Sequence, residues 1–260
     1  MSRRFIPLGL LLGILWLGYK DRALARSEKE AETNALLRLL DENMDLKDFQ
    51  NQVGITFKGA LDLISEKFAA KGKELPFRIN YQAFKKGTTA RSIVDGELPA
   101  KVPSTPRRLP VGTLLRIILE QEDLDATFLI RNGMVEILPA KQATPAWLLK
   151  NKVTGTFYRE TLEDVLQALS FQTGATLVLD CRAGDLAKTP IRAMFRNDVT
   201  LEAALCMVTE MAQLKVVVMP GGIFITTPTH ANGMQKEMLT PRPAKTLGEK
   251  TNKGVDKKVK

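Results

Sequence analysis

The sequence predicts an α+β fold of two tandem modules, each with the order β-α-β-β-α-β-β and with two helices packed against small sheets. Three observations support this prediction. Each half of the chain has two segments with an apolar helical face. Each half ends in two short apolar segments around a glycine-containing turn, closed by Pro139 or by Pro228. Leu115 and Leu205 occupy equivalent places in the two halves, 90 residues apart.

The second module, predicted over residues 152–229, has the clearer signals. Thr161 and Asp164 have the spacing of a capping box, and Gly174 suits the left-handed residue that follows many helices. The predicted elements are a strand at 153–160, a helix at 161–174, strands at 175–180 and 190–195, a helix at 200–214 and a hairpin at 215–227.

The first module, predicted over residues 46–139, follows this order more loosely because it carries a polar insert at residues 85–101. Asn132 and Gly133 are a strong signal for a two-residue hairpin turn. The predicted elements are a helix within 56–73, a strand at 75–84, a helix at 109–124 and a hairpin at 125–138. The remaining segments are a charged, partly helical lead-in at 26–45 and a linker at 140–151.

Residues 1–25 have the three-part layout of a secretory signal peptide. A basic start precedes the apolar run 5–19 and a small-x-small cleavage site at Ala23 and Ala25. The run is shorter than the roughly 20 residues that a membrane-spanning helix needs. We therefore expect a protein that is periplasmic or secreted after cleavage of its leader, and an uncleaved membrane anchor is the alternative.

The net charge of +9 is concentrated at the two ends of the chain. Residues 1–25 carry +3 and residues 231–260 carry +5, which leaves +1 for all the residues between them. Nucleic acid is not an expected partner, because binding it needs a basic face on the folded part. Residues 230–260 are polar and lack apolar periodicity, which predicts a disordered basic tail.

Few side chains in this sequence point to catalysis or metal binding. The only histidine, His230, lies at the edge of the predicted tail, so we expect no catalytic triad, metal site or cofactor site. An enzyme would need a polar pocket between the modules, which the sequence does not indicate. Cys181 and Cys206 could pair in an oxidising compartment; two small buried hydrophobic side chains are the favoured alternative. Gly221 and Gly222 fit a hairpin turn rather than a phosphate loop.

The second module also carries a family resemblance. Its pattern is L-x-x-x-L-x-x-L-x-x-x-T-G, a strand ending in Asp, then L-x-x-A-L and a hairpin. The matching residues are Leu162, Leu166, Leu169, Thr173, Gly174, Asp180, Leu201, Ala204 and Leu205. Over residues 153–228 the chain resembles the STN domain, the short N-terminal domain of secretins and TonB-dependent receptors. The first module is similar to divergent STN-like modules of exported planctomycete proteins of unknown function.

The resemblance implies a signalling or assembly module of the periplasm or cell envelope that contacts another envelope protein and is not an enzyme. STN domains contact a membrane-bound regulator in receptors and lie at the entrance of the pore in secretins. The sequence places the possible partner-binding edge strands in the two hairpins, at Val135, Ile137, Ile223, Phe224 and Ile225. The alternative function is an accessory factor that binds envelope lipid or cell-wall polymer through its basic tail.

Overall fold

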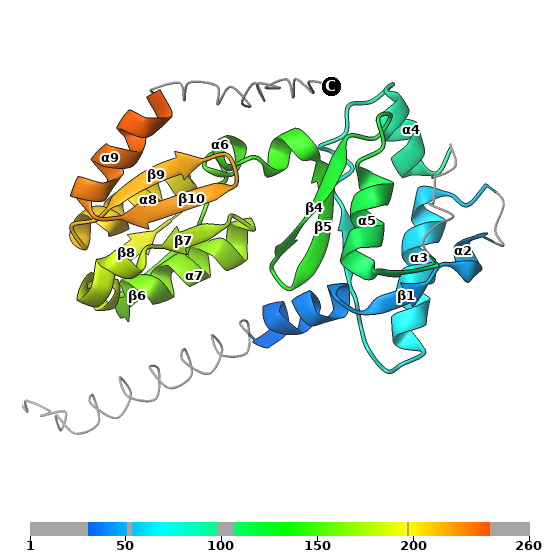
Figure 1. Cartoon of the computed structure of the whole chain (residues 1–260), viewed down its shortest axis with the longest axis horizontal. Helices are drawn as coiled ribbons and strands as arrows, with labels where there is room; N and C mark the ends of the chain where they lie inside the picture. The colour runs from blue at the N-terminus through cyan, green and yellow to red at the C-terminus, as the bar shows by residue number, and fades with distance from the viewer. Residues whose placement is uncertain (1–30, 51–53, 98–106, 197, 240–260) are drawn as a thin grey trace, which may run out of the picture.

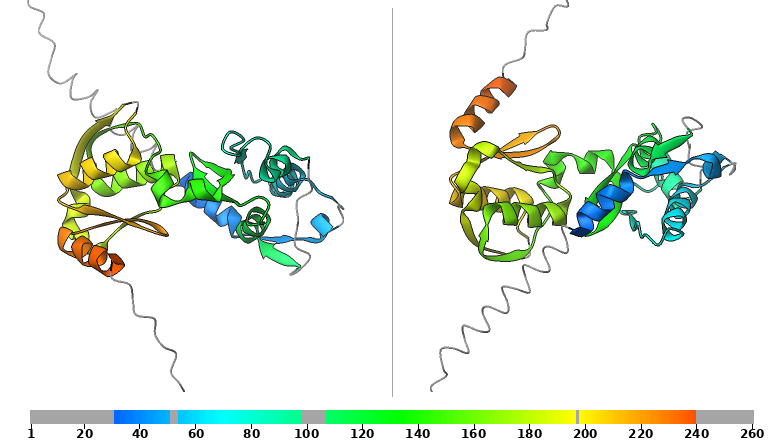
Figure 2. Two further views of the ribbon diagram at one scale, coloured as in Figure 1. Left: turned by 90° about the horizontal axis from the view of Figure 1, so that it is seen from above. Right: turned by 60° about the horizontal axis from the view of Figure 1, so that its bottom comes forward.

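The computed structural model describes residues 31–50, 54–97, 107–196 and 198–239. The predicted cleavage residues Ala23 and Ala25 and the basic residues after 239 lie outside them. Two groups of helices and small sheets lie next to each other along the long axis of the molecule (Figures 1 and 2). The predicted α+β class is confirmed. No helix within the described part of the chain is both long enough and apolar enough to cross a bilayer.

The first module begins with a helix at residues 31–40. It continues with β1 (Asn43–Asp45), α2 (Lys47–Gln50), α3 (Phe57–Ala69), β2 (Phe77–Ile79), α4 (Thr89–Asp95), β3 (Arg108–Pro110), α5 (Val111–Leu119), β4 (Ala126–Arg131) and β5 (Met134–Pro139). Strand β1 pairs with β3, and a second sheet has the order β2-β5-β4.

The second module follows through a short helical connection. Its elements are η1 (Ala140–Ala143), α6 (Pro145–Leu148), β6 (Gly155–Thr161), α7 (Leu162–Thr173), β7 (Leu177–Leu179), η2 (Cys181–Lys188), β8 (Pro190–Phe195), α8 (Leu201–Met211), β9 (Lys215–Met219), β10 (Gly222–Thr226) and α9 (Pro228–Leu239). Strand β6 pairs with β8, and a second sheet has the order β7-β10-β9.

The two modules share the same sheet pairings. As far as the structure describes them, each has one antiparallel strand pair and one three-stranded sheet. In each three-stranded sheet, the final strand lies in the middle, parallel to one neighbour and antiparallel to its hairpin partner. The parallel pairs end in equivalent hydrogen bonds. The N–H of Asn80 donates to the C=O of Ile137, and the N–H of Asp180 donates to the C=O of Ile225, both at 2.9 Å.

The predicted lead-in is partly helical, as expected, with a helix at residues 31–40, and the predicted linker contains α6; both helices pack against a module. The N–H of Val111 donates to the C=O of Glu42 (3.0 Å), and the N–H of Leu201 donates to Asn151 (2.8 Å). The helix at 31–40 and α6 therefore meet the first turns of α5 and α8 in the same way. Both are anchored by leucines that are buried in the cores, Leu36 and Leu40 in the first module and Leu148 and Leu149 in the second.

The structure confirms the helix ends and the turn that were predicted from residues with strong local backbone preferences. Thr161 and Asp164 form the predicted capping box, and Gly174 ends α7 with φ 70°. Asn132 and Gly133 have φ values of 50° and 70°, as a two-residue turn with both residues left-handed requires. The predicted helix at 109–124 is wrong at both ends, because residues 108–110 form β3 and α5 ends at Leu119.

Each module has a separate hydrophobic core formed by its helices and the facing side of its sheets. Val111, Leu115 and Ile118 of α5 are buried in the first core. Leu201, Leu205 and Val208 of α8 hold the same positions in the second. The polar insert predicted at 85–101 contains α4, whose N-terminus is capped by the side chain of Thr88 and whose Ile93 and Val94 are buried in the first core.

The outer faces of the two three-stranded sheets are covered differently. In the first module, Leu129 on β4 packs against the second module's core, and the N–H of Asn132 donates to the C=O of Phe171 on α7 (3.0 Å). In the second module, α9 lies against the sheet (Figure 1). The rings of Phe224 and His230 meet there edge to face at 6.5 Å.

Helix α9 corrects the prediction that disorder begins at residue 230. Ala231 is 2% exposed and Val217, on the outer face of β9, is also 2% exposed, so the helix and the sheet bury each other's apolar atoms. His230 is therefore half-buried on a helix and is not a loop residue.

We expect Gly174→Ala to destabilise the protein by about 1–2 kcal/mol, because alanine at positive φ is strained. An added Cβ would also lie 3.1 Å from Cβ of Leu129 at the contact between modules. Gly72→Ala is the matched control, since Gly72 has φ 69° but nothing within 4 Å of an added Cβ. Urea unfolding of both variants measures the difference. Equal losses would contradict a contribution from the contact between the modules.

Candidate functional site

The partner-binding edge strands predicted in the hairpins are wrong. Val135 and Ile137 lie on β5, and Ile223, Phe224 and Ile225 lie on β10. Both strands are the central strands of their sheets and are paired on both sides. The physical reason is the parallel pairing of β2 with β5 and of β7 with β10, which inserts each final strand into the sheet.

Strand β2 is an outer strand of the first module. Its ladder with β5 uses the C=O of Pro76 and the N–H of Asn80, at 3.0 and 2.9 Å. Alternation along a strand then directs the N–H and C=O groups of Phe77 and Ile79 away from β5. The C=O of Ile79 accepts from the N–H of Tyr81 (3.0 Å). The other three groups have no hydrogen-bond partner among the described residues.

A surface groove of about 540 Å³ runs between this edge and α3. The buried side chains of Leu61 and Leu75 contribute to its lining, together with the half-buried Phe77 and Ile79. Charged residues of both signs also line it, namely Lys58, Asp62, Glu66, Lys73 and Glu74. The groove thus combines an apolar surface with open backbone groups, which is the combination that an added strand needs.

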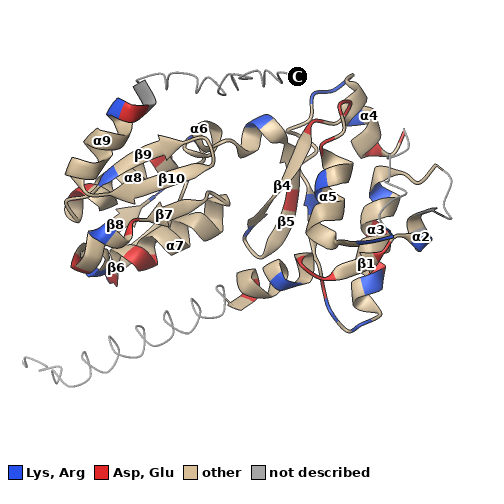
Figure 3. Ribbon diagram, viewed as in Figure 1, with Lys and Arg blue, Asp and Glu red and all other residues tan. Residues whose placement is uncertain are grey.

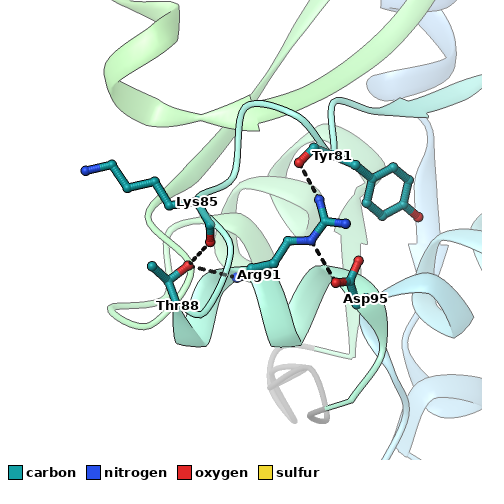
Figure 4. A network of polar contacts seen from close by, with 5 residues as sticks. All are labelled: Tyr81, Lys85, Thr88, Arg91 and Asp95. Atoms are coloured by element: carbon teal, nitrogen blue, oxygen red, sulfur yellow. Dashed lines mark hydrogen bonds and ion pairs between the residues drawn. The ribbon is translucent and has the colours of Figure 1, made fainter.

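Tyr81 also lines the groove. It lies in the loop after β2, next to α4 (Figure 4). The Arg91 guanidinium stacks 5.1 Å from the Tyr81 ring and donates to the Tyr81 carbonyl oxygen. Its Nε also donates to Oδ2 of Asp95 at 2.7 Å. The hydroxyl of Thr88 donates to the C=O of Lys85 at 2.7 Å. These bonds fix the loop, while Tyr81 as a whole remains 38% exposed.

Behind β2, a buried carboxylate is held by basic and amide groups. Glu136 on β5 is 4% exposed, accepts from Nε of Arg131, and accepts from Nδ2 of Asn80 at 3.1 Å. Burial raises the pKa of Glu136, but the hydrogen bond and charge of Arg131, with smaller contributions from Arg78 and Asn80, outweigh it and leave the pKa below the usual 4.5. The network ties β2, β4 and β5 together on the sheet's outer face.

A second hollow, a cleft of about 500 Å³, lies between the modules and has no counterpart in the sequence prediction. It is lined by Gly174–Thr176 just before β7, by the β9–β10 turn and by residues of the segment from Ala140 to Leu148. Glu120 and Asp125 are its charged residues. Both come from the first module, and within the described part of the chain no basic side chain lines the cleft. Basic and acidic residues are interspersed over both modules (Figure 3).

The two cysteines are not paired in the structure. Cys181 and Cys206 are free and both are exposed, so neither the disulfide nor the buried-hydrophobe prediction holds. Gly222 begins β10 immediately after the turn that contains Gly221, as the turn prediction requires. Among the described residues, no group of three or more His, Cys, Asp or Glu side chains could hold a metal ion.

Comparisons with family models, with curated proteins and with solved structures found no match to this chain.

Proposed function

We propose that the protein is a non-catalytic interaction module that binds an extended segment of a partner protein by adding it as a strand to β2. The observation that carries this proposal is the open backbone edge of Phe77 and Ile79 beside the apolar groove along α3. Main-chain hydrogen bonds would supply affinity, and the groove would receive alternate side chains of the segment.

Arg78 gives the proposed partner a chemical preference. It is exposed in the middle of β2, between the two residues with open backbone groups. A side chain directly opposite it on the added strand would lie within about 5 Å, where an opposite charge is favourable and a like charge is not. The expected segment therefore has an acidic residue flanked by apolar residues that enter the groove.

The proposal also includes the cellular compartment of the partner and the resemblance to STN domains. The leader-like residues 1–25 and the resemblance of residues 153–228 to STN domains support a partner in the periplasm or cell envelope. The element order β-α-β-β-α-β-β in β6–β10 is compatible with that resemblance.

Ile79→Pro tests the proposal, because proline removes the outward N–H of Ile79 without removing a bond to β5. We expect peptides selected from a random library on the purified protein to lose at least about tenfold in affinity on this variant, the scale of one lost hydrogen bond together with a steric block. Hydrogen exchange should show the amides of Phe77 and Ile79 becoming protected only when such a peptide is bound.

Leu179→Pro is the matched control, since Leu179 occupies the equivalent position on β7. It should leave peptide binding unchanged. Thermal unfolding of both variants checks that each is folded. Selected peptides that protect other amides, or that bind Ile79→Pro as well as the parent protein, would refute strand addition at β2.

A further inference from the structure

Strand β7 is the counterpart of β2 in the second module and is also an outer strand. The N–H of Ile223 donates to the C=O of Thr176 (2.8 Å), and the N–H of Asp180 donates to Ile225 (2.9 Å). These bonds fix the ladder so that the N–H and C=O groups of Leu177 and Leu179 point away from β10. None of these four groups has a hydrogen-bond partner among the described residues.

This edge is complementary to itself. If two copies meet antiparallel about a two-fold axis at Val178, Leu177 of each lies opposite Leu179 of the other. Both pairs then become hydrogen-bonded pairs that exchange N–H and C=O, and Val178 meets its own copy in the non-hydrogen-bonded position between them. All four open groups on each copy find partners, which is the arrangement that a closed two-fold interface requires.

The side chains on this edge do not oppose such a contact. The strand Leu177–Leu179 contains no charge, no proline and no bulge, the features with which proteins usually protect an outer strand. Val178 is 42% exposed and lies on the side away from the core. In β2 the equivalent position is Arg78, which would meet Arg78 of a second copy, and like charges opposite each other destabilise a strand pair.

We propose that the protein self-associates through β7, forming a two-fold dimer in which two three-stranded sheets join as β9-β10-β7 and its symmetry copy. This inference does not depend on strand addition at β2. Three paired residues bury much less than the roughly 1,200–2,000 Å² of a stable interface. Because interfaces of about 1,600 Å² already reach only micromolar affinity at their weak end, we expect a weak dimer with a dissociation constant on the order of 10–100 µM.

Sedimentation velocity of the purified protein over a concentration series tests this inference. The parent protein should move from monomer toward dimer, and Val178→Arg, which copies the residue of β2, should remain monomeric. Val178 is exposed, so the substitution should not prevent folding. Arg78→Lys, which keeps the charge on β2, should associate like the parent. A parent protein that is monomeric at about ten times the upper expected dissociation constant, or a Val178→Arg variant that still dimerises, would overturn the proposal.

Cross-linking locates the contact independently. In a background of Cys181→Ser and Cys206→Ser, Val178→Cys should form a disulfide between copies under a mild oxidant, because Cα atoms in a non-hydrogen-bonded pair are about 4.5 Å apart. Val218→Cys is the control, since Val218 is similarly exposed on β9 of the same sheet and should not cross-link. Equal cross-linking of both variants would contradict pairing through β7.

Discussion

Leu205→Ala is expected to lower the free energy of unfolding by about 2–5 kcal/mol, the range for truncating a fully buried leucine. Leu205 is 0% exposed on α8 and belongs to the second module's core. The two cores are separate clusters, joined by few contacts such as that of Leu129. The loss of stability should therefore affect mainly the second module.

Hydrogen exchange measures this localisation. In Leu205→Ala, amides of α7, α8 and β10 should exchange faster, while those of α3 and β5 should change little. Leu115→Ala is the matched variant, because Leu115 is also 0% exposed and holds the equivalent place on α5. It should produce the reverse pattern. Uniform acceleration over both modules in either variant would show that they unfold as one unit.

Arg131→Ala is expected to cost about 1–3 kcal/mol at neutral pH, since it removes the main hydrogen-bond donor of the buried Glu136 carboxylate. The cost stays below that of an isolated buried charge, because Asn80 and Arg78 remain near the carboxylate. Urea unfolding at pH 7 measures it. Glu136→Gln is the control, because it removes the carboxylate charge and keeps Arg131. It should lower the free energy of unfolding by less than Arg131→Ala does.

The Arg131–Glu136 pair also predicts that the stability of the protein depends on pH. The folded-state pKa of Glu136 lies below the usual 4.5, so the unfolded chain takes up the proton first as the pH falls. The stability from this group is therefore complete above about pH 5 and is lost as the pH falls through 4.5 toward the folded-state value. Glu136→Gln should flatten that part of the stability curve. An unchanged slope would mean that other carboxylates cause the acid destabilisation.

Much of the fold could be predicted from the sequence because local signals set it. The capping box of Thr161, the left-handed Gly174 and the Asn132–Gly133 turn act within a few residues. The module boundaries were harder to predict. The helix at 31–40 and α6 are short and are held by tertiary contacts, such as the bond from Val111 to Glu42, which no local pattern reports.

The candidate site could not be predicted because strand order depends on long-range pairing. The hairpins look like the ends of each module, yet β2 and β7 pair with β5 and β10 and take the outer positions. Helix α9 was missed for a related reason. Its sequence contains Gly233 and is polar on average, so it shows no clear apolar helical face, and its contacts with Phe224 and with β9 depend on the tertiary fold.

The outer faces of the two sheets are covered by different segments of the chain, so the order of synthesis determines how long each face stays uncovered. When Pro139 has emerged, the first module is complete in sequence, but Phe171 and Gly174, which contact its hairpin, have not yet emerged. At about 5–20 residues per second, they follow several seconds later. Until then Leu129 is exposed to solvent and to other newly made chains. The second module has no such interval, because its cover, α9, is the next segment to emerge.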